Sequence, residues 1–445
     1  MQQANPETII AQRAQSTSVI DRQGYWFSLG SGQLALAAVA IVQLVAVPVQ
    51  VHAVGVEGFG VVSLATTWLG FAAMGAGWLT SGGTRRLGET SARGQWIEYA
   101  SARLAIRWGL VVYGVMLAVI FGLGGWTVSA SLPTQFQARW LETLLWLSLS
   151  AFLQYEQAGW TVILTAATRQ HVCNLASIIQ NGVFLAVLWW LLVYRDGSLP
   201  EIFQALAVGL MASRLVLAVG GRSIHANTER GSLGAGFYGL VTRRGMGYTA
   251  YGGLTQLQNM DVLLLGWLGG AQAAGLFSLL WRIPTLIVQV LWRVPAYLEP
   301  YIIQADAAGD RERVNVLYRQ GVGLFYVAAL AASIGYGALG KWFLDLWLGA
   351  GQAPDRLWEY WLAGGAAFWL VAIRWPSSFL HALARLRPLV IMLVAETGLR
   401  ALLIIGTFDW LGYAAPLLAI NLVIGGGLFW VYRAIGRKQT SWAAH

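Results

Sequence analysis

The sequence has little charge and almost no cysteine. Only 11% of its 445 residues are Asp, Glu, Lys or Arg, whereas a soluble domain usually carries about a quarter. The single cysteine, Cys173, excludes an intrachain disulfide. The five histidines lack metal-ligand spacing, and no HExxH, GxSxG or P-loop motif is present. We therefore expect no enzyme, no metal site, no cofactor and no soluble domain that would bind ATP.

Long apolar runs dominate instead. Hydrophobic residues make up 57% of the chain, and a membrane-spanning helix needs about 20 mostly apolar residues. The sequence predicts 12 spans, at 26–50, 58–82, 97–125, 140–166, 171–193, 201–221, 245–267, 272–302, 320–340, 357–383, 388–408 and 411–435. We predict an all-α integral membrane protein.

The basic residues predict how the chain lies in the membrane. One set of loops, with both termini, holds 18 Arg and Lys residues, and the opposite set holds only Arg139, Arg195, Lys341 and Arg356. Positively charged loops stay in the cytoplasm, so we expect both termini there and the protein in the inner membrane. The basic loops are short and lack interleaved aromatic residues, so nucleic acid is not an expected partner.

The two halves of the sequence resemble each other. Residues 57–64 (EGFGVVSL) align with residues 272–279 (QAAGLFSL) at an offset of 215, and Gln43 meets Gln258 at the same offset. Six spans in each half predict a parallel duplication with a site between the halves. The expected organisation is a cytoplasmic segment, an N-lobe, a cytoplasmic linker, a C-lobe and a cytoplasmic tail, at 1–25, 26–222, 223–244, 245–436 and 437–445.

Three stretches carry a family resemblance. They are GVEGFGVVSLATTWLGFAAMGAGWLTSGGTRRLGE (55–89), LQNMDVLLLGWLGGAQAAGLFSLLWRIP (257–284) and LDLWLGAG (344–351). In them the chain resembles the multidrug/oligosaccharidyl-lipid/polysaccharide (MOP) exporter superfamily, specifically the Wzx-type O-antigen and capsule flippases of polysaccharide and lipopolysaccharide biosynthesis. The resemblance implies two six-helix lobes arranged as in MATE transporters. It also implies alternating access and an undecaprenyl-diphosphate-linked glycan as cargo.

Arginines within the predicted spans are the candidate cargo-binding residues. An arginine near the bilayer centre costs at least a few kcal/mol unless it has a partner or faces water. Arg282 and Arg293 stand in two WRxP units, at 281–284 and 292–295, and eleven residues place them on one helix face. Arg282 is expected near the midplane, facing either a cargo or an internal partner, whereas Arg293 is expected to reach the cytoplasmic headgroups. The proposed cavity residues are Arg282, Arg400, Arg374, Arg214, Gln43 and Gln258.

Three carboxylates within the spans are candidates for coupling to H⁺ or Na⁺. Glu396 and Arg400 are four residues apart and share one helix face, so they either neutralise each other or form a coupling element. Glu156 is either a proton carrier or the partner of an arginine. For Asp261 a structural role is the alternative. Arg103 and Arg107 begin the third span and are expected at the cytoplasmic interface.

Three functions are compatible with this pattern. The first is a flippase or exporter of lipid-linked oligosaccharide, because a net-positive interior suits an anionic cargo. The second is an ion-coupled multidrug or small-molecule antiporter of the same superfamily, and the third is a membrane polysaccharide polymerase or ligase. The expected partners are the glycan cargo, membrane lipids and other polysaccharide-assembly proteins.

Overall fold

All of the regular secondary structure in the residues that the computed structural model describes is helical. These are residues 22–127, 134–195, 197–222, 231–241, 253–307, 310–349, 351–383 and 385–441. Seven helical stretches in them are long and apolar enough to cross a membrane. Two of these, Gly30–Ala76 with 47 residues and Leu386–Ile435 with 50, are each long enough to cross twice. The structure confirms the predicted all-α membrane fold.

The N-terminal half forms one bundle, which we call the N-lobe. Its elements are α2 (Arg22–Ala72), η1 (Ala73–Ala76), α3 (Ser81–Ala92), α4 (Trp96–Thr127), α5 (Thr134–Gln137), α6 (Trp140–Ala166), α7 (Gln170–Trp189), η3 (Trp190–Tyr194), α8 (Leu199–Arg222) and α9 (Leu233–Leu240). A kink at Gly55 divides α2 into two helices. The first two predicted spans are therefore the two arms of one bent element.

The C-terminal half forms the second bundle, the C-lobe. Its elements are η4 (Leu257–Asn259), α11 (Met260–Ala307), α12 (Arg311–Leu348), α13 (Leu357–Ala382), α14 (Leu386–Leu411), η5 (Gly412–Ala414), α15 (Ala415–Ile420), η6 (Asn421–Leu428) and α16 (Phe429–Ser441). A kink at Gly270 divides α11 as Gly55 divides α2. The predicted seventh span lies partly outside the described residues.

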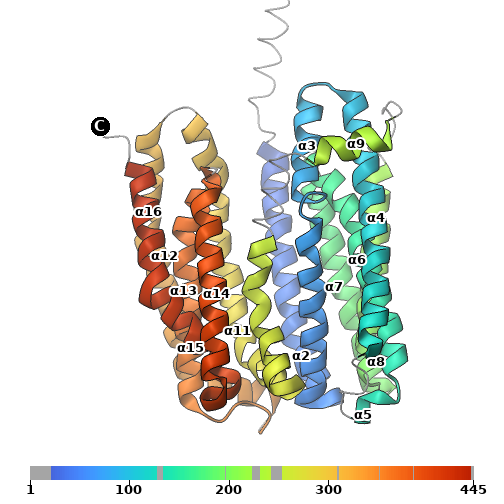
Figure 1. The fold of residues 1–445 in the computed structure, drawn as a ribbon, viewed down its shortest axis with the longest axis vertical. Helices are drawn as coiled ribbons and strands as arrows, with labels where there is room; N and C mark the ends of the chain where they lie inside the picture. Colours follow the sequence, from blue (N-terminus) through green and yellow to red (C-terminus); the bar gives the residue numbers. More distant parts are fainter. Residues whose placement is uncertain are drawn as a thin grey trace, which may run out of the picture.

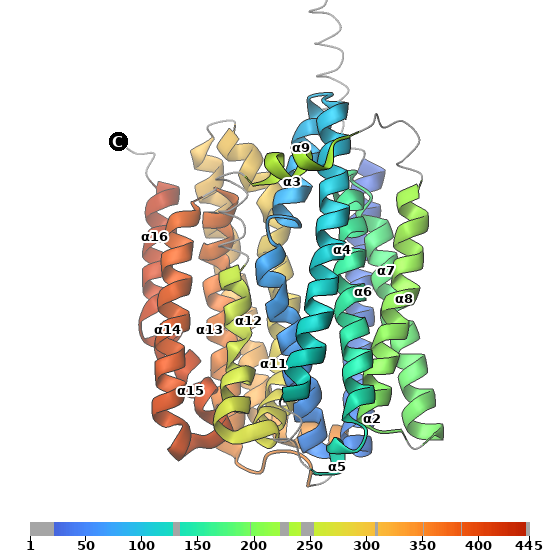
Figure 2. The ribbon, with the colours of Figure 1, turned by 45° about the vertical axis from the view of Figure 1, so that its right-hand side comes forward.

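The two lobes stand side by side, with α2 and α11 in contact at the centre (Figure 1). Helices α4, α6 and α8 lie on the side of the N-lobe away from the C-lobe (Figures 1 and 2). The kinks lie at the lower end of the bundle in Figure 1, which we call the closed end, and α3 and α9 lie at the opposite end. The main apolar cluster of the C-lobe includes Val47, Val51 and Phe59 of α2, so apolar side chains join the lobes.

Helix α9 lies within the segment expected to link the lobes. It packs on α4 of the N-lobe, where the backbone N–H of Ser232 donates a hydrogen bond to Ser101 Oγ at 2.9 Å. A Cβ on Gly236 would lie 2.1 Å from the carbonyl oxygen of Ser101. Only glycine permits so close an approach, and the linker thus carries a helix docked on the N-lobe.

Candidate functional site

Two glycines bend the chain at matching places in the two halves. Gly55 has φ 71° and ψ 176°, and Gly270 has φ 70° and ψ −170°. Positive φ at this ψ is essentially restricted to glycine. The two positions are 215 residues apart, which is the offset of the predicted repeat. The duplication seen in the sequence therefore extends to the same backbone turn in both lobes.

The lobes touch most closely just beyond these turns. A Cβ on Gly60 would lie 1.8 Å from the carbonyl oxygen of Ala271, and a Cβ on Gly275 would lie 2.3 Å from that of Val56. Small residues let membrane helices pack backbone against backbone. Gly60 and Gly275 are also 215 residues apart, so the two lobes contribute equivalent residues to the contact that holds the closed end together.

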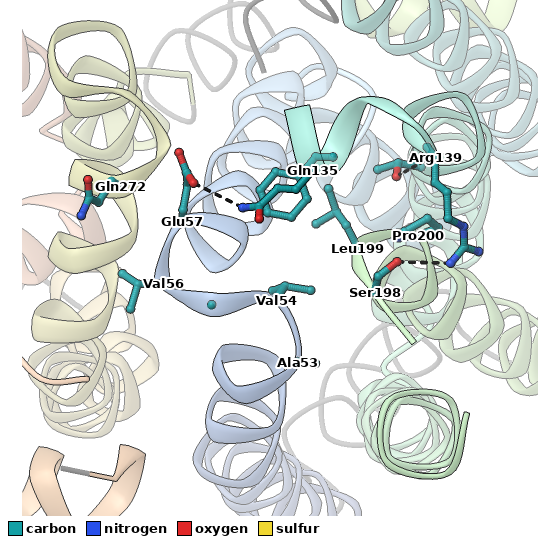
Figure 3. A pocket seen from close by; sticks show the side chains of 13 residues that line it. Ala53, Val54, Val56, Glu57, Gln135, Arg139, Ser198, Leu199, Pro200 and Gln272 are labelled. Carbon is teal, nitrogen blue, oxygen red and sulfur yellow. Dashed lines mark hydrogen bonds between the residues drawn. The ribbon is translucent and has the colours of Figure 1, made fainter. Parts of the chain in front are cut away.

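A polar pocket of about 640 Å³ lies beside this contact (Figure 3). Both lobes line it, because Glu57 comes from α2 and Gln272 from α11. Gln135 Nε2 donates to Glu57 Oε2 at 3.4 Å. Sequence reasoning missed these residues, although Glu57 and Gln272 stand at the start of the two aligned segments and are themselves paired by the repeat.

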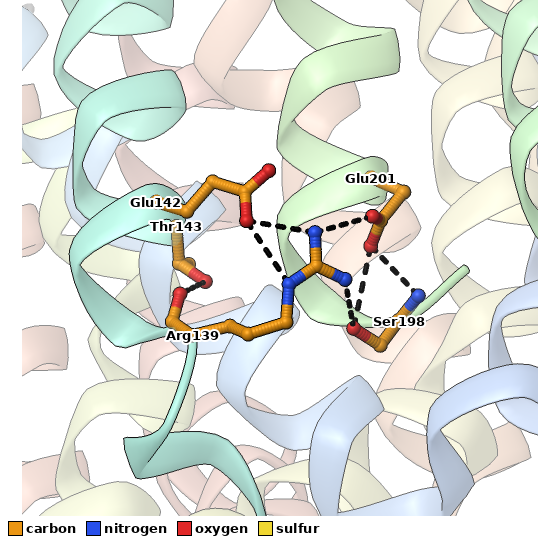
Figure 4. A network of polar contacts seen from close by, with 5 residues as sticks. All are labelled: Arg139, Glu142, Thr143, Ser198 and Glu201. Atoms are coloured by element: carbon orange, nitrogen blue, oxygen red, sulfur yellow. Dashed lines mark hydrogen bonds and ion pairs between the residues drawn. The ribbon is translucent and has the colours of Figure 1, made fainter.

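An ion-pair network lies in the N-lobe next to this pocket (Figure 4). Arg139 Nη2 lies 2.7 Å from both Glu142 Oε2 and Glu201 Oε1, and Arg139 Nη1 donates to Ser198 Oγ at 3.2 Å. Hydrogen bonds to Glu201 and Glu142 raise the pKa of Arg139 above its ordinary value. The network joins the starts of α6 and α8, and it keeps Arg139 positively charged at the closed end.

Arg282 lies on the face of α11 that the N-lobe contacts. It follows Gly275 by seven residues, or two helical turns, and so points to the same side about 10 Å farther from the closed end. Its side chain is partly exposed. Its Nε is buried without a hydrogen-bond partner, and Arg282 forms no ion pair with any residue that the structure describes. Counted from Gly270, it lies about 18 Å into the helix, near the middle of a ~30 Å hydrocarbon core.

The second WRxP unit has a different environment. Arg293 is exposed, and the same count places it about 35 Å from Gly270, beyond the hydrocarbon core. Its neighbour Trp292 covers Arg374 of α13, whose guanidinium carbon lies 3.4 Å from the centre of the indole ring. Such a contact stabilises a partly desolvated cation. Arg374 is only 8% exposed, so in this conformation the indole covers it.

The C-lobe buries one arginine between two carboxylates. Arg400 Nη1 lies 3.1 Å from Glu396 Oε1, four residues away on α14, and Arg400 Nη2 contacts Asp261 Oδ2 of α11. The three side chains are at most 5% exposed. Sequence reasoning paired Glu396 with Arg400 and left Asp261 outside the pair. Because both carboxylates and the protein enclose Arg400, it has no access to a cargo in this conformation.

The N-lobe has a cluster of the opposite composition. Glu156 of α6 accepts from Arg214 Nε of α8 at 2.6 Å and from Arg107 Nη2 of α4 at 3.2 Å. Glu156 is 5% exposed, whereas Arg107 is 24% and Arg214 43% exposed. Arg107 was expected at the cytoplasmic interface, and no pairing with Glu156 was predicted for it. Its guanidinium also stacks on Trp160 at 3.9 Å, which the i,i+4 spacing of Glu156 and Trp160 makes possible.

The two glutamines predicted to line the cavity lie in α2 and η4. Gln43 is partly buried, and its Oε1 is buried without a hydrogen-bond partner among the described residues. Gln258 lies in η4, but its side chain is outside the described part of the structure. The structure thus divides the predicted site residues into two ion-pair clusters, of which the C-lobe cluster is buried and the N-lobe cluster is partly exposed, and, apart from them, Arg282, Arg374 and the glutamines.

No protein-family model matches the chain, and no curated protein matches it by sequence. Solved structures do match. A multidrug resistance MATE family transporter of the MOP superfamily in its inward-facing conformation has a TM-score of 0.75 and 14% identity, over 91% of this chain and 95% of that chain. A MATE transporter of the superfamily in an outward-facing conformation has a TM-score of 0.64 and 13% identity, over 95% and 99%.

A third similar structure is a MOP superfamily transporter from Pyrococcus furiosus, described as having a binding pocket of reverse polarity that suggests a different function. Its TM-score is 0.65 at 13% identity, over 94% of this chain and 98% of that chain. The chain therefore has a MATE-like fold. Its backbone is more similar to the inward-facing structure than to the outward-facing one.

Proposed function

We propose that this protein is a secondary transporter that moves a lipid-linked, anionic saccharide across the inner membrane by alternating access. The observation that carries the proposal is Arg282, a mid-depth guanidinium on the face of α11 that the N-lobe contacts. A positive charge there is costly unless water or an anion reaches it. Arginine binds phosphate by two parallel charge-assisted hydrogen bonds, so the diphosphate of an undecaprenyl-linked glycan is a fitting ligand.

The distribution of carboxylates favours this cargo over a cationic drug. Glu156, Glu396 and Asp261 are each bound by an arginine and are at most 5% exposed, so none of the three is open to a cationic drug in this conformation. A multidrug antiporter of the same fold remains the second candidate. A polysaccharide polymerase or ligase, the third, lacks support because the predicted connections at the closed end are short.

The positions of the basic loops support an orientation with the closed end in the periplasm and both termini in the cytoplasm. In this orientation the described conformation receives cargo from the cytoplasmic leaflet. Opening the closed end would require the backbones around Gly60 and Gly275 to separate. Contacts with other polysaccharide-assembly proteins stay a prediction from the family resemblance.

The C-lobe cluster is the proposed coupling site. It holds two carboxylates against one guanidinium, so it carries one uncompensated negative charge when both are ionised. A buried charge without compensation is strongly unfavourable, and one bound proton removes it. This charge balance fits a proton as the coupling ion, and Na⁺ is the alternative.

The test is a flipping assay in proteoliposomes with an undecaprenyl-diphosphate-linked oligosaccharide. Arg282→Gln is expected to slow flipping about tenfold to a hundredfold, because it removes charge-assisted hydrogen bonds of about 1.5–3 kcal/mol. Arg282→Lys keeps the charge but lacks the planar guanidinium group. Its flipping rate is expected to lie between those of Arg282→Gln and the wild type.

The matched control is Arg293→Gln, which makes the same change in the second WRxP unit outside the hydrocarbon core. It is expected to leave flipping nearly unchanged. Equal rates for Arg282→Gln and the wild type would remove Arg282 from the cargo site. If Arg282→Gln instead impaired export of a cationic dye, the drug antiporter would be the better proposal.

A further inference from the structure

The outer side of the N-lobe carries charged residues where aliphatic side chains would be expected. Helices α4, α6 and α8 form this side, with α6 packed between the other two. Large exposed hydrophobic residues identify the membrane-facing surface, namely Trp108, Val112, Leu145, Leu215 and Val219. Glu156 follows Leu145 by eleven residues, or three turns, and so shares its face. Arg107 and Arg214 border this surface, because Leu104 and Met211, three residues before them on the same helix faces, are exposed.

These three charged residues form a cluster with a net charge of +1. Both oxygens of Glu156 are engaged, one by each arginine. Arg214 is 43% exposed at the membrane-facing surface. Among the described residues Arg214 is bound only through Nε, by Glu156, so its two terminal nitrogens are not used by the protein. Arg107 Nη1, in contrast, is buried. The cluster thus combines an excess positive charge with the open donors of Arg214.

The depth of the cluster matches that of lipid headgroups. Measured along the helices from their closed ends, Arg214 is about 22 Å from Leu199 and Arg107 about 30 Å from Thr127. The hydrocarbon core is about 30 Å thick, so Arg107 lies at its far boundary and Arg214 about 8 Å inside it. A long arginine side chain can extend from such a depth toward the phosphate level.

We propose that Arg214 holds the phosphate of an anionic phospholipid against the outer surface of the N-lobe, with Arg107 adding a second positive charge beside it. Basic pockets between membrane helices on the cytoplasmic side bind such headgroups. Glu156 fixes both guanidinium groups but cancels only one of their charges. The aliphatic residues around the cluster provide contacts for acyl chains, which favours a lipid over free phosphate. The site is separate from the proposed cargo path and independent of the cargo.

Lipid binding to the purified full-length protein, measured by native mass spectrometry with phosphatidylglycerol or phosphatidylcholine, tests the proposal. Arg214→Gln leaves the neutral pair of Arg107 and Glu156, which protects the fold. It is expected to weaken the first phosphatidylglycerol adduct about tenfold, because a charge-assisted hydrogen bond is lost. Glu156→Gln raises the charge to +2 and is expected to strengthen that adduct, which a purely structural role would not predict.

The matched control is Arg222→Gln, on the same helix near the same membrane surface. It removes the same charge and is expected to leave the first adduct unchanged, while phosphatidylcholine binding should be equal in all variants. Equal phosphatidylglycerol affinities of the wild type and Arg214→Gln would overturn the proposal. Displacement of the lipid by millimolar inorganic phosphate would also overturn it, since the site would then bind free phosphate.

Discussion

The two lobes are alike in backbone and opposite in buried charge. Gly55 and Gly60 of the N-lobe have counterparts in Gly270 and Gly275 of the C-lobe, with the same left-handed turn and the same close approach. The N-lobe cluster instead has two arginines around one carboxylate, whereas the C-lobe cluster has one arginine between two carboxylates.

Exposure and depth separate the two clusters as well. The arginines of the N-lobe cluster are 24% and 43% exposed, and they lie about 22–30 Å from the closed end. Arg400 of the C-lobe is 2% exposed and lies about 17 Å from Leu411, near mid-membrane. The repeat thus keeps the glycines at the contact between the lobes, whereas the charged clusters differ: the N-lobe cluster is rich in arginine and partly exposed, and the C-lobe cluster is rich in carboxylates and buried.

The largest expected effect comes from breaking the symmetric contact. Gly60→Ala places a Cβ 1.8 Å from the carbonyl oxygen of Ala271, so the lobes must separate at the closed end. In a Cys173→Ala, Gln272→Cys background, labelling by an impermeant maleimide from the periplasmic side is expected to rise several-fold. Gly398→Ala is the matched control, because nothing lies within 4 Å of its added Cβ. Unchanged labelling in Gly60→Ala would contradict the proposed closure.

The next largest effect concerns the sealed cluster. Arg400→Gln leaves two buried carboxylates without a counter-charge and is expected to cost about 3–5 kcal/mol of stability. Thermal unfolding in detergent measures the loss. Arg282→Gln removes a guanidinium at similar depth that has no ion-pair partner among the described residues, and it is expected to leave stability equal or higher. Similar losses of stability in Arg400→Gln and Arg282→Gln would contradict the prediction that only Arg400 stabilises the fold through its carboxylate partners.

A smaller effect is expected in the N-lobe cluster. Glu156→Gln leaves two arginines that are partly exposed, so each remaining charge is better solvated than the carboxylates of the C-lobe would be. The expected loss is about 2 kcal/mol, the value of a hydrogen bond to a charged group. In phosphatidylglycerol nanodiscs Glu156→Gln should lose less stability than it does in phosphatidylcholine nanodiscs. A loss as large as that of Arg400→Gln would remove the contrast between the clusters.

The smallest effect is expected at the network in Figure 4. Arg139→Gln breaks ion pairs with Glu142 and Glu201, and the Arg139 side chain is 46% exposed. Exposed ion pairs contribute about 1 kcal/mol or less, so thermal unfolding should change little and flipping should persist. A large fall in flipping with stability intact would give this network a role in closing the pocket, beyond bracing the N-lobe.

The fold was largely predictable because hydropathy and glycine positions can be read from the sequence. Apolar runs of membrane length locate the helices, and the repeat offset of 215 residues pairs Gly60 with Gly275. Helix α9 was missed because its eight residues are too few for a periodic signal and its stability depends on packing against α4. The bend between the two arms of α2 depends on the backbone angle of Gly55, which the residue composition does not reveal.

Within the candidate site, only contacts between residues of the same helix could be predicted from the sequence. The pair of Glu396 and Arg400 follows from their spacing of four residues, but Asp261 comes from another helix, and helix-to-helix register has no sequence signal. For the same reason Arg107 was not joined to Glu156, nor Arg374 to Trp292. Arg282 was singled out because an arginine is rare in an apolar run, and that signal is independent of tertiary structure.

The most direct test of the account is the aqueous accessibility of position 282. In an Arg282→Cys, Cys173→Ala variant, a charged thiosulfonate reagent added from the cytoplasmic side should label the introduced thiol. An undecaprenyl diphosphate-linked oligosaccharide should slow that labelling if it occupies the same space. The account predicts rapid labelling with protection by the cargo. A thiol that stays unlabelled, or one labelled equally fast with and without the cargo, would contradict it.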